Sequence, residues 1–392
     1  MIPLLLAALF SLATYPPTSR AAYFPLYDFS GSTFFDGFDF YGAIDNTTWG
    51  NVSYVTAEDA AAESLAYINT AGNAILRVDN TSTVLNTGTV QYRKSVRLTS
   101  KAAFDVGTLF VVDAVHMPFG CSVWPSIWLN GVLEEGQVWP QAGEMDLVEA
   151  INLMERNQMA LHSYEGCVQP QNVAQLGTTL KHDCNDTTAS GCTVAETKAN
   201  SYGPGFNNAG GGAFALQFDV AGVFMWFWSR ADIPQSILES SADQSTGMSL
   251  TDWGPPSAAY PAGPGGCNIT QFFPAQQLVL DITLCGLWAG IPEIYAEDCQ
   301  GSCVHQIAGN GSNYADAYFE IPFIRTWTVS PGVAASVAAS ASSASSSSAA
   351  EASQTAGGGG ALATGAGTGT ALGMDWMLGL QLAVWIWIGI WM

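Results

Sequence analysis

Positive charge is scarce in this chain, which carries 11 Lys and Arg against 33 Asp and Glu in 392 residues, a formal net charge of -22. A phosphate backbone would be repelled by such a protein, so we expect no nucleic-acid partner. Long segments with the 3.6-residue period of an amphipathic helix are also missing, which argues against a helical fold. Hydrophobic residues make up 48% of the chain, which is enough for a large buried core.

Closely spaced Cys-x-x-Cys pairs are absent and the 4 histidines are scattered, so we expect no zinc site. Cysteine itself is present in an even number suited to disulfide bonds in an oxidising compartment. The 8 cysteines allow many pairings, and the sequence leaves the pairing open. They all lie between residues 23 and 330: Cys121, Cys167, Cys184, Cys192, Cys267, Cys285, Cys299 and Cys303.

Residues 1–22 contain an apolar run from Ile2 to Leu12, followed by polar residues and the small pair Ala21 and Ala22. Although no Lys or Arg precedes the run, this pattern is typical of a secretory signal peptide. A membrane anchor is the alternative, but a helical span takes about 20 apolar residues and this run is shorter. We expect cleavage near residue 22.

Residues 331–375 are rich in Ala, Ser, Gly and Thr, and residues 376–392 form an apolar tail that no Lys or Arg follows. Small residues, a polar spacer and a hydrophobic tail are the signal for a GPI anchor, here with attachment between about residues 356 and 367. The alternative is a single transmembrane helix, for which the tail is marginally short. The Ser/Ala-rich segment then forms a flexible stalk, suited to O-glycosylation.

Sequons for N-glycosylation indicate a glycosylated surface when they accompany a signal peptide, and they mark exposed loops. The chain has six, at Asn46, Asn51, Asn80, Asn185, Asn268 and Asn310.

No linker divides residues 23–330, so we expect one domain. Short runs rich in Val, Phe, Trp, Leu and Ile, separated by Gly, Pro, Asn and Asp, predict an all-β fold of two stacked antiparallel sheets. The runs cover residues 108–114, 144–151, 158–163, 214–219, 223–229, 277–284 and 317–329. Residues 214–219 and 223–229 have the pattern of a hairpin around a short turn that contains Gly222.

Three carboxylates, Glu144, Asp146 and Glu149, lie within six residues of one apolar run. Side chains alternate between the faces of a strand, so Glu149 would point away from Glu144 on a regular strand. One extra residue in a β-bulge after Asp146 restores the parity and places all three acids on one face. Their mutual repulsion then separates their pKa values, as glycoside hydrolysis by an acid and an ionised carboxylate requires.

The sequence around these acids resembles the core of glycoside hydrolase family 16. The resemblance rests on Trp124-Pro125-Ser126-Ile127-Trp128, then residues 143–149, then Leu161-His162-Ser163. Weaker matches cover residues 95–98, 116–121, 203–207, 226–230 and 285–290. The chain is most similar to the fungal endo-β-1,3(4)-glucanases, or laminarinases, which have the longer, bulged spacing of the acids.

This resemblance implies a concanavalin A-like jelly roll with a concave cleft, in which Glu144 is the nucleophile, Asp146 assists it and Glu149 is the acid/base. It implies β-glucan as the substrate, a monomer, and catalysis without a cofactor. Relatives often hold a structural calcium ion, but no ligand set for one stands out here. Leu287 occupies a position where many fungal relatives have Asp, so local contacts to the sugar are expected to differ.

Four further residues are candidates for substrate binding: Trp124, Trp128, His162 and Trp288. Sugar rings present C–H faces that stack on aromatic rings, although each tryptophan could instead pack in the core. His162 is either a hydrogen-bond partner near the nucleophile or a buried histidine satisfied within the sheet. Trp226 and Trp228 share one face of their strand, and we expect them to pack in the core.

These observations favour a retaining endo-glucanase held at the cell surface by a GPI anchor, with attachment to the cell wall as a further expectation. A wall transglycosylase would use the same covalent intermediate and pass it to a sugar hydroxyl. A glucan-binding protein without activity is the third alternative, but it would not need all three acids.

Overall fold

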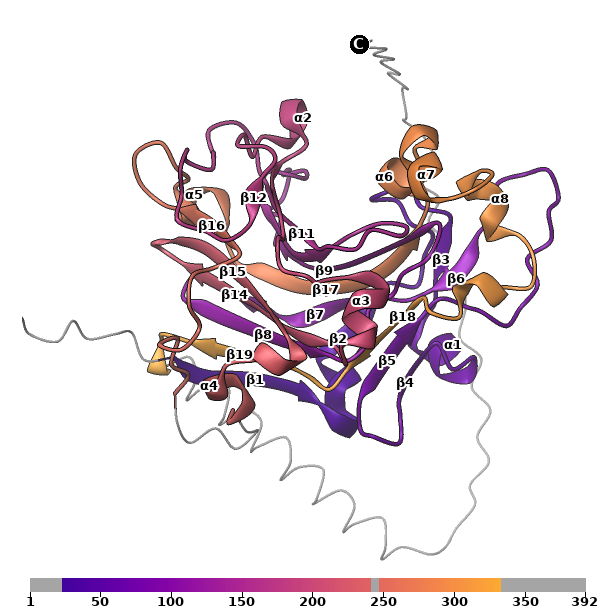
Figure 1. Cartoon of the computed structure of the whole chain (residues 1–392), viewed down its shortest axis with the longest axis horizontal. Helices are drawn as coiled ribbons and strands as arrows, with labels where there is room; N and C mark the ends of the chain where they lie inside the picture. The colour runs from indigo at the N-terminus through magenta and orange to yellow at the C-terminus, as the bar shows by residue number, and fades with distance from the viewer. Residues whose placement is uncertain (1–22, 241–246, 333–392) are drawn as a thin grey trace, which may run out of the picture. The chain divides into compact units, whose positions relative to one another are not determined.

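The computed structural model describes residues 23–240 and 247–332 (Figure 1). The expected signal peptide, most of the stalk and the whole apolar tail lie outside these residues. Among the helices of the described part, none is long and apolar enough to cross a membrane.

Two antiparallel sheets form the body of the described domain (Figure 1). The six-stranded sheet has the order β1 (Phe24–Ser30), β19 (Phe323–Thr328), β8 (Thr108–Ala114), β14 (Gly212–Asp219), β15 (Gly222–Ser229) and β16 (Ala258–Pro261). The eight-stranded sheet has the order β12 (Thr178–Thr179), β13 (Cys192–Ala195), β11 (Gln158–His162), β10 (Glu144–Glu149), β9 (Val123–Gly131), β17 (Gln276–Leu284), β7 (Arg97–Phe104) and β2 (Phe38–Phe40). The expected two-sheet antiparallel sandwich is confirmed.

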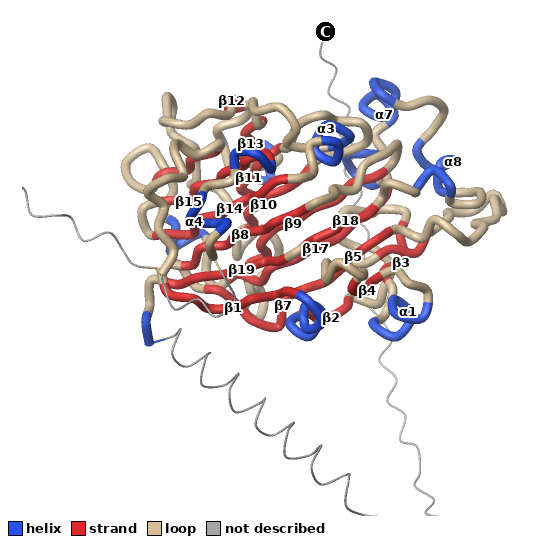
Figure 2. Tube along the Cα trace, turned by 60° about the horizontal axis from the view of Figure 1, so that its bottom comes forward, coloured by secondary structure: helices blue, strands red, loops and turns tan. Residues whose placement is uncertain are grey.

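Smaller elements occupy the connections, as the blue helices of Figure 2 show. One small sheet contains β18 (Tyr318–Ile321), β5 (Ala74–Arg77) and β4 (Ala66–Ile68), and β3 (Val52–Tyr54) pairs in parallel with β6 (Arg93–Ser95). The helices are α1 (Ala57–Ala62), α2 (Asp186–Ala189), α3 (Gly203–Asn208), α4 (Gln235–Leu238), α5 (Ile269–Phe272), α6 (Gly286–Ala289), α7 (Pro292–Asp298) and α8 (Cys303–Ile307). Short 3₁₀ helices span Gly31–Gly37, Arg230–Asp232 and Ser312–Tyr314.

The main hydrophobic core lies between the two large sheets, because alternate residues of their strands point inward. Ile127 of β9, Leu280 of β17 and Phe214 of β14 are fully buried in this one cluster. The other face of the six-stranded sheet carries a second cluster that includes Trp226 and Trp228. Both tryptophans are therefore packing residues, as expected.

The hairpin of β14 and β15 is confirmed, with Asp219 opposite Gly222 across a two-residue turn. The expectation of one strand over residues 317–329 is wrong. Pro322 lacks the N–H group that would continue the ladder, and the run divides there into β18 and β19, which belong to different sheets.

All 8 cysteines form disulfide bonds, as their number and the expected secretion predicted: Cys121–Cys299, Cys167–Cys267, Cys184–Cys192 and Cys285–Cys303. Three of them hold segments around the eight-stranded sheet. One closes the turn that carries α2. Of the other two, one ties the segment before β9 to the end of α7, and one ties the residue before α6 to the beginning of α8. In Figure 1, α2 and the α6–α7 segment lie to either side of β9 and β11.

The sequons do not all mark exposed loops. Asn46, Asn268 and Asn310 are exposed and Asn80 is half-buried, but Asn51 and Asn185 are buried. The side-chain amide of Asn51 donates to Gln91 O, and Asn185 Oδ1 accepts from Thr187, so both side chains have internal partners. These two are buried where an exposed position was expected, and glycosylation at all six stays a prediction.

Candidate active site

The central strand β10 contains the bulge that the parity of its acids required. Asp146 pairs with Trp128 of β9, and Glu149 pairs with Ser126. The two acids are three positions apart on β10, whereas their partners are only two positions apart on β9. Met145, Leu147 and Val148 are buried in the core between the sheets. Glu144, Asp146 and Glu149 therefore share the outer face of the eight-stranded sheet, as predicted.

Glu149 is held by two neighbours at the end of β10. Trp124 Nε1 donates to its carboxylate at 2.9 Å, and its backbone N–H donates to Asn157 Oδ1 at 2.9 Å. The amide of Asn157 in turn donates to Leu147 O, which spans the bulge. Trp124 is only 8% exposed, so it offers little surface to a sugar, and its clear role is the hydrogen bond to Glu149.

Glu144 has a tryptophan partner that the sequence analysis did not identify. Trp139 Nε1 donates to Glu144 Oε2 at 2.9 Å, and the indole is 47% exposed. Of the tryptophans that touch the acids, Trp139 offers the larger surface for stacking on a sugar. The sequence indicated this contact only by a tryptophan five residues before Glu144, in a segment that contains Gly136, Pro140 and Gly143.

Asp146 and His162 form an ion pair, because Asp146 Oδ2 lies 3.1 Å from His162 Nε2. That buried oxygen has no hydrogen bond of good geometry, so the charge of the ring supplies most of its stabilisation. The opposite ring nitrogen, Nδ1, lies 2.7 Å from Asp186 Oδ1. His162 thus bridges two carboxylates, and Asp186 is a second residue that the sequence analysis missed.

Burial raises the pKa of Glu144 and of Glu149, and the negative charge of Asp146 raises both further. The positive charge of His162 acts in the opposite direction on both, and each tryptophan N–H lowers the pKa of the carboxylate it contacts. Burial alone would lower the pKa of His162, but the contacts with Asp146 and Asp186 outweigh it and hold that pKa well above its usual value. The site therefore contains carboxyls poised to exchange protons near neutral pH beside a charged imidazole.

Trp128 lies on the same face, next to the acids. Its Nε1 donates to Asp281 Oδ1 at 2.7 Å, and the Arg97 guanidinium lies 5.3 Å from its ring centre. Tyr54 donates to the other oxygen of Asp281, whose pKa is raised by burial. One face of Trp128 is therefore covered by Arg97, which limits how a sugar can stack on it.

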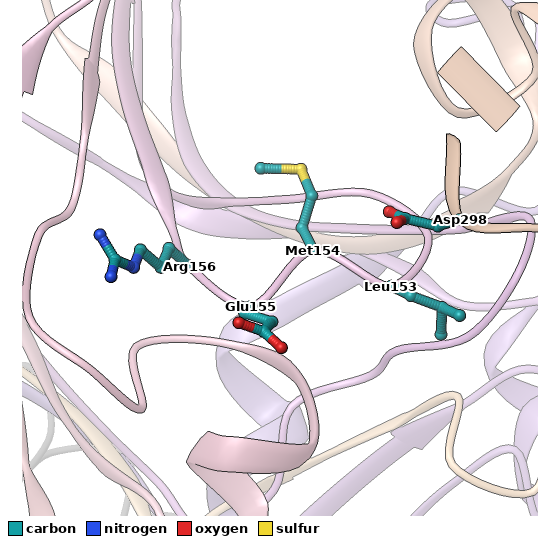
Figure 3. Close-up of a pocket in the computed structure, with 5 residues that line it drawn as sticks. All are labelled: Leu153, Met154, Glu155, Arg156 and Asp298. Carbon is teal, nitrogen blue, oxygen red and sulfur yellow. The ribbon is translucent and has the colours of Figure 1, made fainter. Parts of the chain in front are cut away.

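Trp288 is half-buried on α6 and meets Trp124 edge to face, with 5.6 Å between ring centres. The neighbouring Leu287 is 63% exposed. All four predicted binding residues thus lie at or beside the acids, while their contact with a sugar stays a prediction. A separate pocket is lined by residues that include none of them: Leu153, Met154, Glu155, Arg156 and Asp298 (Figure 3).

Glu144, Asp146 and His162 each offer one atom within 4.8 Å of the others, a spacing that would suit a metal ion. The histidine does not fit that role while its ring is charged, because Nδ1 hydrogen-bonds Asp186 and Nε2 forms an ion pair with Asp146. A metal ligand needs a free lone pair on one ring nitrogen. The trio is thus better described as a charge cluster, and calcium binding elsewhere stays a prediction.

A two-sheet antiparallel sandwich with two glutamates and an aspartate on the outer face of its central strand has the pair of carboxyls that glycoside hydrolases use, and this places the protein in that class of enzyme. Comparison with known proteins agrees. The XgeA-like, catalytic GH16 domain matches residues 38–327. A probable glycosidase of Schizosaccharomyces pombe is 33% identical over 312 residues, which cover 78% of this chain and 70% of that protein.

Two solved structures are also similar. GH16 laminarinase 16A from Phanerochaete chrysosporium, solved with β-glucans in its donor and acceptor sites, has a TM-score of 0.71 and 33% identity. A GH family 16 β-1,3-glucosyltransferase described as elongating has a TM-score of 0.67 and 34% identity. Each comparison covers 78% of this chain and 100% of the other. The chain belongs to glycoside hydrolase family 16.

Several curated relatives are much longer than the matched region. The chain spans 42% and 46% of two Aspergillus proteins named probable endo-1,3(4)-beta-glucanases, from A. niger and A. fumigatus. The likeness to them therefore concerns the catalytic domain.

Proposed function

We propose that this protein cleaves internal β-1,3 and mixed β-1,3/1,4 glucosidic bonds of glucans with retention of configuration. The observation that carries the proposal is the bulge of β10, which brings Glu144, Asp146 and Glu149 to one face. A retaining enzyme needs two carboxyls about 5 to 5.5 Å apart, one to attack the anomeric carbon and one to protonate the leaving oxygen. Similarity to a laminarinase that holds β-glucans in its active site supports the choice of substrate.

The surroundings of the two glutamates favour Glu144 as the nucleophile. Its carboxylate reaches within 4.8 Å of both Asp146 and the charged ring of His162, and a nearby positive charge favours the ionised form. Burial is the largest influence on both glutamates and raises the pKa of each to about 8, so the assignment rests on the position of His162 beside Glu144 and of Trp124 against Glu149. A carboxyl kept protonated there can donate its proton to the departing sugar oxygen.

The reaction then follows two displacements. Glu144 attacks the anomeric carbon while Glu149 protonates the leaving oxygen, which leaves a glucosyl ester on Glu144. Glu149, now ionised, takes a proton from water, which attacks the same carbon and releases Glu144. Asp146 stays paired with His162 throughout, and its negative charge raises the pKa of Glu144.

Product analysis tests the proposal. Laminarin, lichenan and barley β-glucan are each incubated with the enzyme, and the first anomer formed is followed by proton NMR. We expect short oligosaccharides from laminarin and the β-anomer as the first product. Formation of the α-anomer, or release of glucose alone, would contradict a retaining endo-acting enzyme.

Transfer to a sugar is the second candidate function, because the chain is 34% identical to a family 16 β-1,3-glucosyltransferase described as elongating. The same intermediate would pass to a sugar hydroxyl in place of water. Laminarin mixed with a fluorescent laminari-oligosaccharide separates the two activities, since label enters longer chains only by transfer. Binding of laminarin without any product would instead favour a glucan-binding protein.

We also propose that the protein is secreted and anchored by GPI at the cell surface and wall. The apolar run within residues 1–22, the Ser/Ala-rich segment and the apolar tail support this location. Release of the intact protein from cells by a phosphatidylinositol-specific phospholipase C is the expected result. Release only by detergent would favour a transmembrane helix.

Two matched tryptophan variants test the roles of the glutamates. Trp139→Phe removes the donor to Glu144 and should raise its pKa, so the acidic limb of the kcat/KM profile moves up by about half a pH unit. Trp124→Phe removes the donor to Glu149 and should raise the alkaline limb instead. Each variant is the control for the other. Movement of the same limb in both would mean that the roles are wrongly divided.

A further inference from the structure

His162 has carboxylates on both sides of its ring. Nδ1 lies 2.7 Å from Asp186 Oδ1, and Nε2 lies 3.1 Å from Asp146 Oδ2. A neutral imidazole donates from one nitrogen and presents a lone pair at the other. That lone pair would face a carboxylate oxygen at one of the two contacts, so the arrangement fits an imidazolium that hydrogen-bonds Asp186 and forms an ion pair with Asp146.

The backbone around Asp186 is built to hold this contact. The N–H of Asp186 donates to Ser163 O, and the N–H of Ser163 donates to Cys184 O, so the turn is fixed to the residue after His162. Cys184 and Cys192 close the turn with a disulfide bond. Gly191 completes it at a φ of +73°, where a Cβ atom would lie 2.6 Å from His162 Nδ1. Only glycine leaves room for the ring there.

We propose that Asp186 is a positioning residue for the catalytic carboxylates, because it binds Nδ1 of His162 and keeps that ring charged and directed at Asp146 and Glu144. This inference rests on the proposed function for its effect on catalysis. Asp186 touches neither acid. Its own negative charge raises the pKa of Glu144, but the charged ring that it holds lowers that pKa by more, so the effect through the histidine dominates.

The charge of His162 matters because the acids around it repel one another. Glu144 and Asp146 of β10 and Asp186 of α2 face the ring, and the indole of Trp139 lies 6.1 Å from it. The charge of the ring also lowers the pKa of Glu149 at the end of β10. One cation between Asp146 and Glu144 permits both carboxylates to be ionised together. Without Asp186 the buried ring would lose its proton at lower pH, and Glu144 would hold its proton to higher pH.

The expected consequence is a shift of the pH profile. In Asp186→Asn, which keeps the size of the side chain and removes its charge, the acidic limb of kcat/KM should move up by about one pH unit. Activity on laminarin at the acidic side should then fall about 10-fold, with a smaller change at the alkaline side. The matched control is Asp316→Asn, which removes a carboxylate 3.9 Å from His116, a different histidine, and should leave the profile unchanged.

A double variant separates positioning from a merely structural role. If Asp186 acts through His162, its replacement should have little further effect on the profile of His162→Gln. A uniform fall of kcat at every pH in Asp186→Asn, with both limbs in place, would overturn the proposal, as would a profile identical to that of the control.

NMR gives a readout that does not depend on activity. With 4 histidines in the chain, imidazole ¹⁵N signals can be assigned by single His→Gln changes. We expect both nitrogens of His162 to stay protonated to well above the usual histidine pKa, and to deprotonate at lower pH in Asp186→Asn. A neutral His162 at pH 6.5 to 7 in the native protein would refute the inference even if the enzyme proved to be an active glucanase.

Discussion

Glu149→Gln is expected to lower kcat/KM on laminarin by about 10³-fold or more, because the sugar oxygen would leave without a proton. An aryl laminaribioside with an acidic phenol needs no such help, so the first displacement on this substrate should continue and the glucosyl ester should accumulate. The measurements are reducing-end release from laminarin and a burst of phenol from the aryl glycoside.

Glu144→Gln should abolish both reactions, because no covalent intermediate can form on the amide. The contrast between substrates thus assigns the two roles separately. Glu58→Gln, at an exposed position on α1, is the control and should retain full activity. Full activity on laminarin in either active-site variant would show that the carboxylates on β10 do not perform the reaction.

The bulge was predictable because it follows from counting. An odd spacing between Asp146 and Glu149 cannot place both on one face of a regular strand. Leu147 and Val148 are both apolar, so a bulge can place both side chains in the core. Strands such as β8, β14, β15 and β17 were predictable because β-branched and aromatic runs between turn residues show their length directly, whereas others, including β1, β7 and β9, were not predicted. Pro322 marked the one run that was extended too far, and its missing N–H group was visible in the sequence.

The partners of the acids were less accessible because they come from distant parts of the chain. Asp281 meets Trp128 from β17, and Asp186 meets His162 across a disulfide-closed turn. Neither residue belongs to a local pattern, since a single aspartate is usually solvated and its sequence neighbours do not show which side chain it meets. The same limit applies to the disulfide pairing and to the burial of Asn51 and Asn185, which depend on how segments meet in three dimensions.

The negative charge of the chain is compatible with its proposed chemistry. A neutral polysaccharide is not repelled by a net charge of -22, and the acids that matter act at short range. Asp146 raises the pKa of both glutamates, while His162 lowers both. Burial, the largest influence on both pKa values, and the balance between one aspartate and one imidazolium therefore set the pH range of activity more than the overall charge does.

The length of the bulge can be changed by deleting one residue from β10. Deleting Leu147 leaves Glu144, Asp146 and Glu149 at successive alternate positions, so a regular strand would still place all three on the outer face. We expect this variant to keep activity on laminarin within about 10²-fold of the native enzyme. It should lose stability by about 2 to 5 kcal/mol, because a buried leucine is removed from the core.

Inserting one alanine between Leu147 and Val148 has the opposite effect on parity. A strand with a single bulge would then direct Glu149 into the apolar core, where an unpaired carboxylate is costly. We expect activity to fall about as far as in Glu149→Gln. The pH profile of the remaining activity should lose its alkaline limb. Melting temperatures and circular dichroism show whether each variant is folded. A folded deletion variant without activity, or an insertion variant with native activity, would show that the shared face is not what brings the acids to the substrate.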